Sequence, residues 1–202
     1  MLIRSMRQAG FTIIEMMIAL TIMTLLIFLA LPNMSTWLNN TQIRTAGETL
    51  LAGINLARTE ALRNNTVVRF QTTTTLDSAC ALSTTGTNWV VSLTNPAGAC
   101  DAAPSNTAAP QIIQKKSGAE GSQRATVTAD ASTIFFNGLG RLASPGGAAN
   151  ITQIDIANPA GVCQHVDATN GTMRCLRITI SNGGQIKMCD PAVTDATDPR
   201  IC

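Results

Sequence analysis

The chain has 202 residues, of which 14 are Lys or Arg and 12 are Asp or Glu, so its formal net charge is +2. A charge balance this close to neutral excludes a global attraction for nucleic acid. The length suits an N-terminal helical segment followed by one domain with its own core, and it argues against a second domain.

Residues 1–10 form a short leader that carries Arg4 and Arg7, and an apolar run of 21 residues follows, from Phe11 to Leu31. As an α-helix this run would measure about 31 Å, the thickness of a bilayer's hydrocarbon core. Basic residues on its N-terminal side predict a cytoplasmic leader and an exported body. A secretory signal is the alternative, but its apolar region has only about 7 to 15 residues and is removed. We therefore expect a retained transmembrane helix over residues 11–31.

Glu15 lies inside this apolar run. An unpaired carboxylate in the middle of a membrane costs about 2.5 to 3.5 kcal/mol, so Glu15 needs a partner or a shallow position. The plainer alternative is an acidic residue tolerated near the interface of a signal anchor. A functional carboxylate is the favoured interpretation.

Residues 10–15, Gly-Phe-Thr-Ile-Ile-Glu, resemble the processing motif of type IV prepilins. The resemblance implies that a prepilin peptidase of the inner membrane cleaves between Gly10 and Phe11 and methylates the new terminus at Phe11. It also implies a role for Glu15 in assembly with other pilins or pseudopilins. In that family the matching acid approaches the N-terminal amine of a neighbouring subunit, so two groups that are costly in lipid neutralise each other.

A second helical segment is expected over residues 32–64. Pro32 would remove a helical hydrogen bond and kink the chain. Beyond it, apolar and small residues recur at alternating steps of four and three, which predicts an amphipathic helix that ends near Asn64. These residues are Ile43, Gly47, Leu50, Ile54, Ala57 and Ala61.

The stretch from Leu56 to Asn64 resembles the helix-end signature of the GspH and FimT group of minor pilins and pseudopilins. This resemblance implies a structural subunit, anchored in the inner membrane with its head domain in the periplasm. It implies that the subunit helps to initiate or cap a type IV pilus or a type II secretion pseudopilus. The sequence does not separate the two filaments.

Residues 65–202 are expected to form an antiparallel β head, which gives an α+β fold with a long N-terminal helix packed on the head. The period changes from helical to strand-like after Asn65. The expected strands are Thr66–Thr72, Trp89–Leu93, Gln111–Lys115, Ala125–Ala129, Thr133–Asn137, Ile151–Ala157, Arg174–Ser181 and Gln185–Cys189.

All six cysteines follow the membrane segment, where an oxidising periplasm would allow disulfides. Six cysteines allow 15 pairings, and the favoured hypothesis is the local one. A zinc site is the alternative, but no C-x-x-C spacing occurs and the single histidine, His165, lies in a polar stretch, so no metal or other cofactor is expected. The local pairs are Cys80 with Cys100, Cys163 with Cys175, and Cys189 with Cys202.

The last two expected strands form a hairpin whose turn follows from side-chain parity. A three-residue turn through Gly184 pairs Ile180 with Ile186 and Ile178 with Met188, which keeps the apolar residues on one face. The outer face then carries Arg177, Thr179, Gln185 and Lys187.

This hairpin raises an alternative function, double-stranded DNA capture in natural transformation. Some FimT-like minor pilins bind DNA through a C-terminal Gly-Arg-x-Arg motif, and the matching segment here is Gly184-Gln185-Ile186-Lys187. Glutamine cannot neutralise a phosphate and lysine lacks the guanidinium fork, so the affinity should be lower. A solvated basic face is the competing interpretation. The candidate DNA contacts are Arg174, Arg177, Gln185 and Lys187, with Arg141 as a compensating cation and Asp190, Asp195 and Asp198 opposing them.

Catalysis is not expected. The sequence has no Ser-His-Asp or Cys-His spacing, no phosphate-binding loop and no histidine cluster. The segment from Gly138 to Arg141 is too short for a dinucleotide-binding motif and is expected to be a loop.

Overall fold

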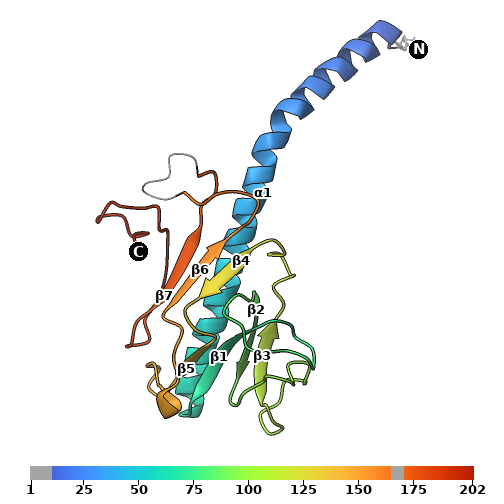
Figure 1. Ribbon diagram of the computed structural model, residues 1–202. Helices are drawn as coiled ribbons and strands as arrows, with labels where there is room; N and C mark the ends of the chain where they lie inside the picture. The colour runs from blue at the N-terminus through green and yellow to red at the C-terminus, as the bar shows by residue number, and fades with distance from the viewer. Residues whose placement is uncertain (1–10, 165–170) are drawn as a thin grey trace, which may run out of the picture. The chain divides into compact units, whose positions relative to one another are not determined.

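The computed structural model describes residues 11–164 and 171–202 (Figure 1). The chain divides into two compact units, Met1–Trp37 and Leu38–Cys202. One 52-residue helix, α1 (Ile13–Asn64), contributes to both units. Its helical assignment continues through Pro32, so this proline does not end the helix, and the expected kink stays a prediction.

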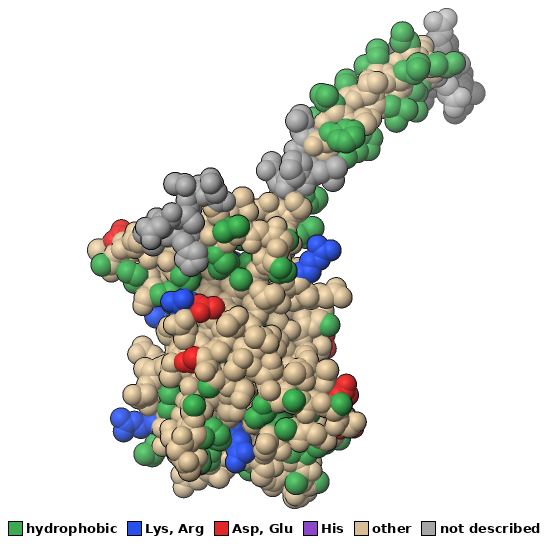
Figure 2. All heavy atoms as spheres, viewed as in Figure 1, with side chains coloured by type: hydrophobic (Ala, Val, Ile, Leu, Met, Phe, Trp, Pro, Cys, Tyr) green, Lys and Arg blue, Asp and Glu red, His purple; other side chains and the backbone are tan. Residues whose placement is uncertain are grey.

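In the first unit, every side chain from Phe11 to Phe28 is exposed, and most of them are apolar (Figure 2). The hydroxyls of Thr21 and Thr24 donate to the carbonyls of Ile18 and Leu20, at 2.8 Å and 2.5 Å, so these polar groups are satisfied within the helix. Over the residues that the structure describes, no helix is both long enough and apolar enough to cross a membrane, and the span expected over residues 11–31 stays a prediction.

In the second unit, the predicted stripe of α1 is buried. Arg44 and Glu48 lie on the opposite, exposed side and form an ion pair of 2.8 Å. The helix is therefore amphipathic here as expected, because one face packs on the sheets and the other meets solvent. The buried residues of α1 are Ile43, Ala46, Gly47, Leu50, Gly53, Ile54, Ala57, Glu60 and Ala61.

Eight strands form two four-stranded antiparallel sheets, with strand orders β3-β2-β1-β5 and β4-β6-β7-β8. Both sheets pack on α1 in the head (Figure 1). The expected antiparallel β head is confirmed, and each strand lies within two residues of its predicted bounds. The strands are β1 (Val68–Thr73), β2 (Asn88–Ser92), β3 (Ile112–Lys116), β4 (Thr126–Ala129), β5 (Thr133–Phe136), β6 (Gln153–Ala157), β7 (Leu176–Ile180) and β8 (Ile186–Cys189), with a short 3-10 turn, η1 (Pro145–Gly147), between β5 and β6.

Strand β1 begins two residues later than predicted for a local reason. The N–H of Thr66 donates to the carbonyl of Ala61 at 3.3 Å, and Asn65 has a φ of 46°. Thr66 therefore closes the C-terminus of α1 and cannot join the sheet.

The turn between β7 and β8 has the predicted length. Ile180 pairs with Ile186 and Ile178 pairs with Met188. Gly184 has a φ of 81°, and its N–H donates to the carbonyl of Ser181 at 2.8 Å. A three-residue turn with glycine in the left-handed region satisfies both the register and the side-chain parity.

Gly184 is also the point at which this turn meets the segment 137–141. A Cβ at Gly184 would lie 2.0 Å from the carbonyl oxygen of Gly140, whereas a Cβ at Gly147, whose φ is 78°, would meet nothing within 4 Å. At both positions the positive φ disfavours a residue with a Cβ atom. Only at Gly184 would that Cβ also overlap a neighbouring atom.

We expect Gly184→Ala to lower the free energy of unfolding by at least about 2 kcal/mol, because steric overlap adds to the backbone strain. The control Gly147→Ala should cost only about 1 kcal/mol, the backbone contribution alone. Thermal unfolding of the two purified variants checks this difference. Equal losses in both would contradict the tight contact between the two turns.

Candidate functional site

Two regions hold the predicted functional residues: the beginning of α1 and the β7–β8 hairpin with the C-terminal tail. The leader with Gly10, and His165 in the second gap, lie outside the described residues. Over the described residues, no group of three or more His, Cys, Asp or Glu side chains is arranged to hold a metal ion.

At the beginning of α1, the side chains of Phe11 and Glu15 are exposed. The N–H of Glu15 donates to the hydroxyl of Thr12 at 3.3 Å, so Thr12 caps the helix and Glu15 is its third residue. Thr-x-x-Glu is the sequence pattern of a capping box, and an acidic side chain in the first turn also suits the helix dipole. Sequence reasoning missed this local role, although the pattern was visible.

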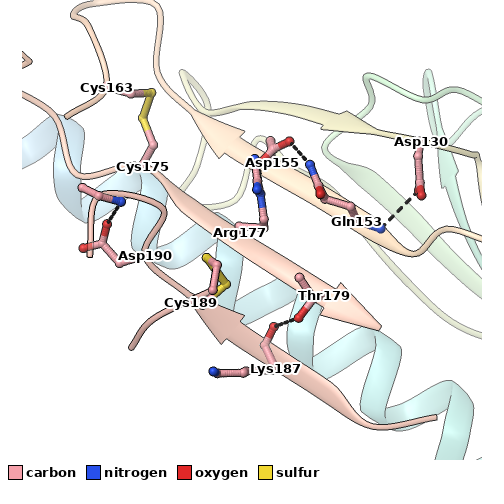
Figure 3. A network of polar contacts seen from close by, with 12 residues as sticks. Asp130, Gln153, Asp155, Cys163, Cys175, Arg177, Thr179, Lys187, Cys189 and Asp190 are labelled. Carbon is pink, nitrogen blue, oxygen red and sulfur yellow. Dashed lines mark hydrogen bonds and ion pairs between the residues drawn. A yellow bond between two sulfur atoms is a disulfide. The ribbon is translucent and has the colours of Figure 1, made fainter. Parts of the chain in front are cut away.

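The three predicted cations of the hairpin region each have a partner, and Figure 3 shows Arg177 beside Asp155. The Nε of Arg177 donates to Asp155 Oδ1 at 2.6 Å, and the guanidinium of Arg174 lies 3.3 Å from the buried carboxylate of Asp190. The ammonium of Lys187 donates to the carbonyl of Ile201 at 2.7 Å. These contacts occupy hydrogen-bond donors that a phosphate would need. The cations of the hairpin are therefore less available to DNA than the sequence indicated.

The C-terminal tail, residues 190–202, explains the contact at Lys187. Cys189 is two residues from Lys187 on the same strand, so both side chains lie on the outer face of β8. The disulfide from Cys189 to Cys202 and the hydrogen bond of 2.8 Å from Asp190 N–H to the Arg200 carbonyl hold the tail against this strand.

An ion pair inside the tail strengthens its fold. Arg200 donates two hydrogen bonds to Asp198, at 3.0 Å and 2.6 Å, and these lower the pKa of the Asp198 carboxyl to about 2. Because this pKa lies below its ordinary value, the contribution of the pair is present above the ordinary pKa and is lost only as the pH falls towards 2.

The remaining two candidates lie at the hairpin turn. Gln185 is exposed, and its N–H donates to the hydroxyl of Ser181 at 3.1 Å. Arg141 is also exposed, and its Cα lies 3.3 Å from the position of a Cβ built on Gly184. The structure therefore brings Arg141 and the hairpin turn together, although more than 40 residues separate them in the sequence.

Three disulfides join Cys80 to Cys100, Cys163 to Cys175, and Cys189 to Cys202. These are the local pairs expected from the spacing. Cys80 and Cys100 belong to a small second core with Val90 and Ile112, on the face of β2 and β3 that α1 does not cover.

A long N-terminal helix packed on antiparallel sheets, with the helix exposed before the head, is the architecture of a minor pilin or pseudopilin. The family model described as "Type II transport protein GspH" matches residues 46–184. The model described as "Prokaryotic N-terminal methylation motif" matches residues 5–31. The chain belongs to the GspH family, the GspH/FimT group of minor pilins and pseudopilins, whose members are structural proteins.

Two crystal structures of the type IV minor pilin FimU from Pseudomonas aeruginosa are similar to this chain at 16% identity. The structure in space group P65 has a TM-score of 0.41 and covers 72% of this chain and 90% of FimU. The structure in space group P21 has a TM-score of 0.42 and covers 72% and 87%. No curated protein sequence matches the chain.

The tail contacts predict a specific effect of removing the last disulfide. In the double variant Cys189→Ser/Cys202→Ser, the tail should detach and trypsin should cleave after Arg200 at least several-fold faster. The free energy of unfolding should fall by about 3 kcal/mol, as expected for a loop of this length.

Mass spectrometry after reduction measures the cleavage. The matched control is Cys80→Ser/Cys100→Ser, which removes a disulfide elsewhere and should leave the rate of cleavage after Arg200 unchanged. An unchanged rate in the variant at Cys189 and Cys202 would show that the disulfide does not hold the tail.

Proposed function

We propose that this protein is a membrane-anchored minor subunit that helps to initiate or cap a type IV pilus or a type II secretion pseudopilus. The observation that carries the proposal is the separation of two apolar surfaces. The buried core begins at Ile43, whereas the apolar side chains of residues 11–28 are exposed. An apolar helix that the head does not need is free to lie in lipid and then against the helices of other subunits.

The organisation that we propose follows the sequence. Prepilin peptidase removes residues 1–10 and methylates Phe11, residues 11–31 anchor the protein in the inner membrane, and residues 32–64 continue into a periplasmic head of residues 65–202. Three disulfides in the head support an oxidising compartment.

Glu15 has two roles in this proposal. Before assembly its side chain is placed to complete the capping box that Thr12 begins, and the backbone N–H of Glu15 donates to the Thr12 hydroxyl. In the filament its carboxylate neutralises the Phe11 amine of a neighbouring subunit, a pairing that removes two costly charges from an apolar environment. No ion-pair or side-chain hydrogen-bond partner of the Glu15 carboxylate is present among the described residues, so it is available for that contact.

Glu15→Val and Glu15→Gln separate these roles. Glutamine can replace glutamate in a capping box, but it carries no charge. If the charge pair governs assembly, both variants should remain in the membrane fraction and be cleaved, yet their amount in sheared filaments should fall about tenfold, equivalent to about 1.4 kcal/mol.

Immunoblots of membrane and filament fractions measure both quantities. The control Glu48→Gln removes an exposed carboxylate of the head and should enter filaments normally. Full recovery of filament entry with Glu15→Gln would assign Glu15 to helix capping alone.

DNA capture is a second proposal, supported by the exposed side chains of Gln185 and Lys187 on the outer face of the hairpin. The contacts of Arg174, Arg177 and Lys187 weigh against it. Competition from Asp155, Asp190 and the Ile201 carbonyl lowers the gain from each phosphate contact.

The salt dependence of binding tests this second proposal. If the hairpin binds double-stranded DNA, the slope of log affinity against log salt should become shallower by about 1 in Lys187→Ala, because one phosphate contact is lost. The control Lys116→Ala, on β3, should leave the slope unchanged. Absence of binding by the detergent-solubilised full chain at low salt would end the DNA proposal.

A further inference from the structure

Three segments that are distant in the sequence meet at the end of the head where α1 finishes. The Nε of Arg58 on α1 donates to the Gly140 carbonyl at 3.1 Å, and a Cβ at Gly140 would lie 3.3 Å from the methyl groups of Leu62. The β7–β8 turn contacts the same carbonyl through Gly184. We call the exposed side chains of Leu62, Leu139 and Arg141, together with the partly buried side chain of Arg58, the end patch.

The turn that carries Leu139 has a fixed backbone. The Oδ1 of Asn137 accepts hydrogen bonds from the N–H groups of Leu139 and Arg141, at 3.0 Å and 3.1 Å, and the N–H of Asn137 donates to the Arg141 carbonyl at 3.0 Å. Yet the Leu139 side chain is 73% exposed, and that of Leu62 is 49% exposed. A large apolar side chain on an ordered backbone can be buried by a partner with little cost of ordering.

The cations of the end patch are not neutralised. Over the described residues, neither Arg58 nor Arg141 has a carboxylate within ion-pair distance, whereas nearby Arg63 is paired with Glu60 at 2.9 Å. Figure 2 shows Lys and Arg side chains among hydrophobic ones at the lower end of the head. The complement of such a surface is an apolar side chain flanked by carboxylates.

We propose that the end patch binds the head of a neighbouring pilin or pseudopilin, through an acidic and apolar surface of that partner. This inference rests on the proposed function. Leu62 and Leu139 are buried in this contact, and Arg58 and Arg141 pair with carboxylates. Nucleic acid fits less well, because two guanidinium groups give few phosphate contacts and the leucines have no counterpart on a phosphate backbone.

Site-specific photo-cross-linking of the full chain in its own cells tests this contact. A benzophenone side chain replaces Leu139 in one variant and, in the control, Val162, which is also exposed, at 64%. We expect a cross-link from position 139 to a subunit that carries its own N-terminal methylation helix, with a several-fold lower yield from position 162. The cross-linked peptide of the partner should contain Asp or Glu.

A charge reversal at Arg141 provides the second test of the docking contact. Arg141→Glu should lower the cross-link yield about tenfold, the change that about 1.4 kcal/mol of docking free energy produces. Arg124→Glu is the matched control, because Arg124 is also exposed and has no ion pair within the described part of the chain. Its cross-link yield should stay at the level of the unsubstituted chain.

Three outcomes would overturn the proposal: equal yields from positions 139 and 162, equal effects of the two charge reversals, or a partner that is not a filament subunit. Loss of the cross-link on adding double-stranded DNA to permeabilised cells would reassign the end patch to nucleic acid. If the chain is present in sheared filaments and position 139 still does not cross-link, only the docking contact fails. If the chain is absent from those filaments, the proposed function itself fails.

Discussion

The head depends on the burial of one stripe of α1, from Ile43 to Ala61, against both sheets. Glycines on this stripe let the two sheets approach the helix closely. A Cβ at Gly47 would lie 3.0 Å from the sulfur of Met188 on β8, and one at Gly53 would lie 2.8 Å from the ring of Phe70 on β1. One face of α1 therefore packs against both sheets.

The burial of this stripe gives the two parts of α1 different surroundings. Because the described buried hydrophobic residues begin at Ile43, the exposed apolar side chains before it contribute nothing to the core of the head. The N-terminal part can satisfy a membrane and a filament interface without compromising the fold. Glu15 illustrates this freedom, since a residue in the core could not carry an unpaired carboxylate at so small a cost to folding.

Local sequence patterns predicted much of this structure, because they reflect local physics. The stripe of α1, the eight strands and the turn at Gly184 follow from periodicity and parity. The division of the strands into two sheets did not follow, since β1 pairs with β5 across more than 50 residues. The contact of Lys187 with the tail and the approach of Arg141 to the hairpin are also long-range. The capping pattern at Thr12 and Glu15 is local, and the sequence motif Thr-x-x-Glu was sufficient to predict it.

Two groups of cations in the head differ in their contacts. Those of the hairpin are held by Asp155, Asp190 and the tail, and they consolidate the fold. In the end patch, Arg58 donates to the Gly140 carbonyl, but within the described residues neither Arg58 nor Arg141 has a carboxylate partner, so their positive charge is available to a partner. This difference favours a subunit that works through protein contacts at both ends of α1. Intact mass measurement of the chain from sheared filaments tests that account most directly. It predicts a protein that begins at N-methylated Phe11, whereas a retained leader or a start beyond Pro32 would contradict it.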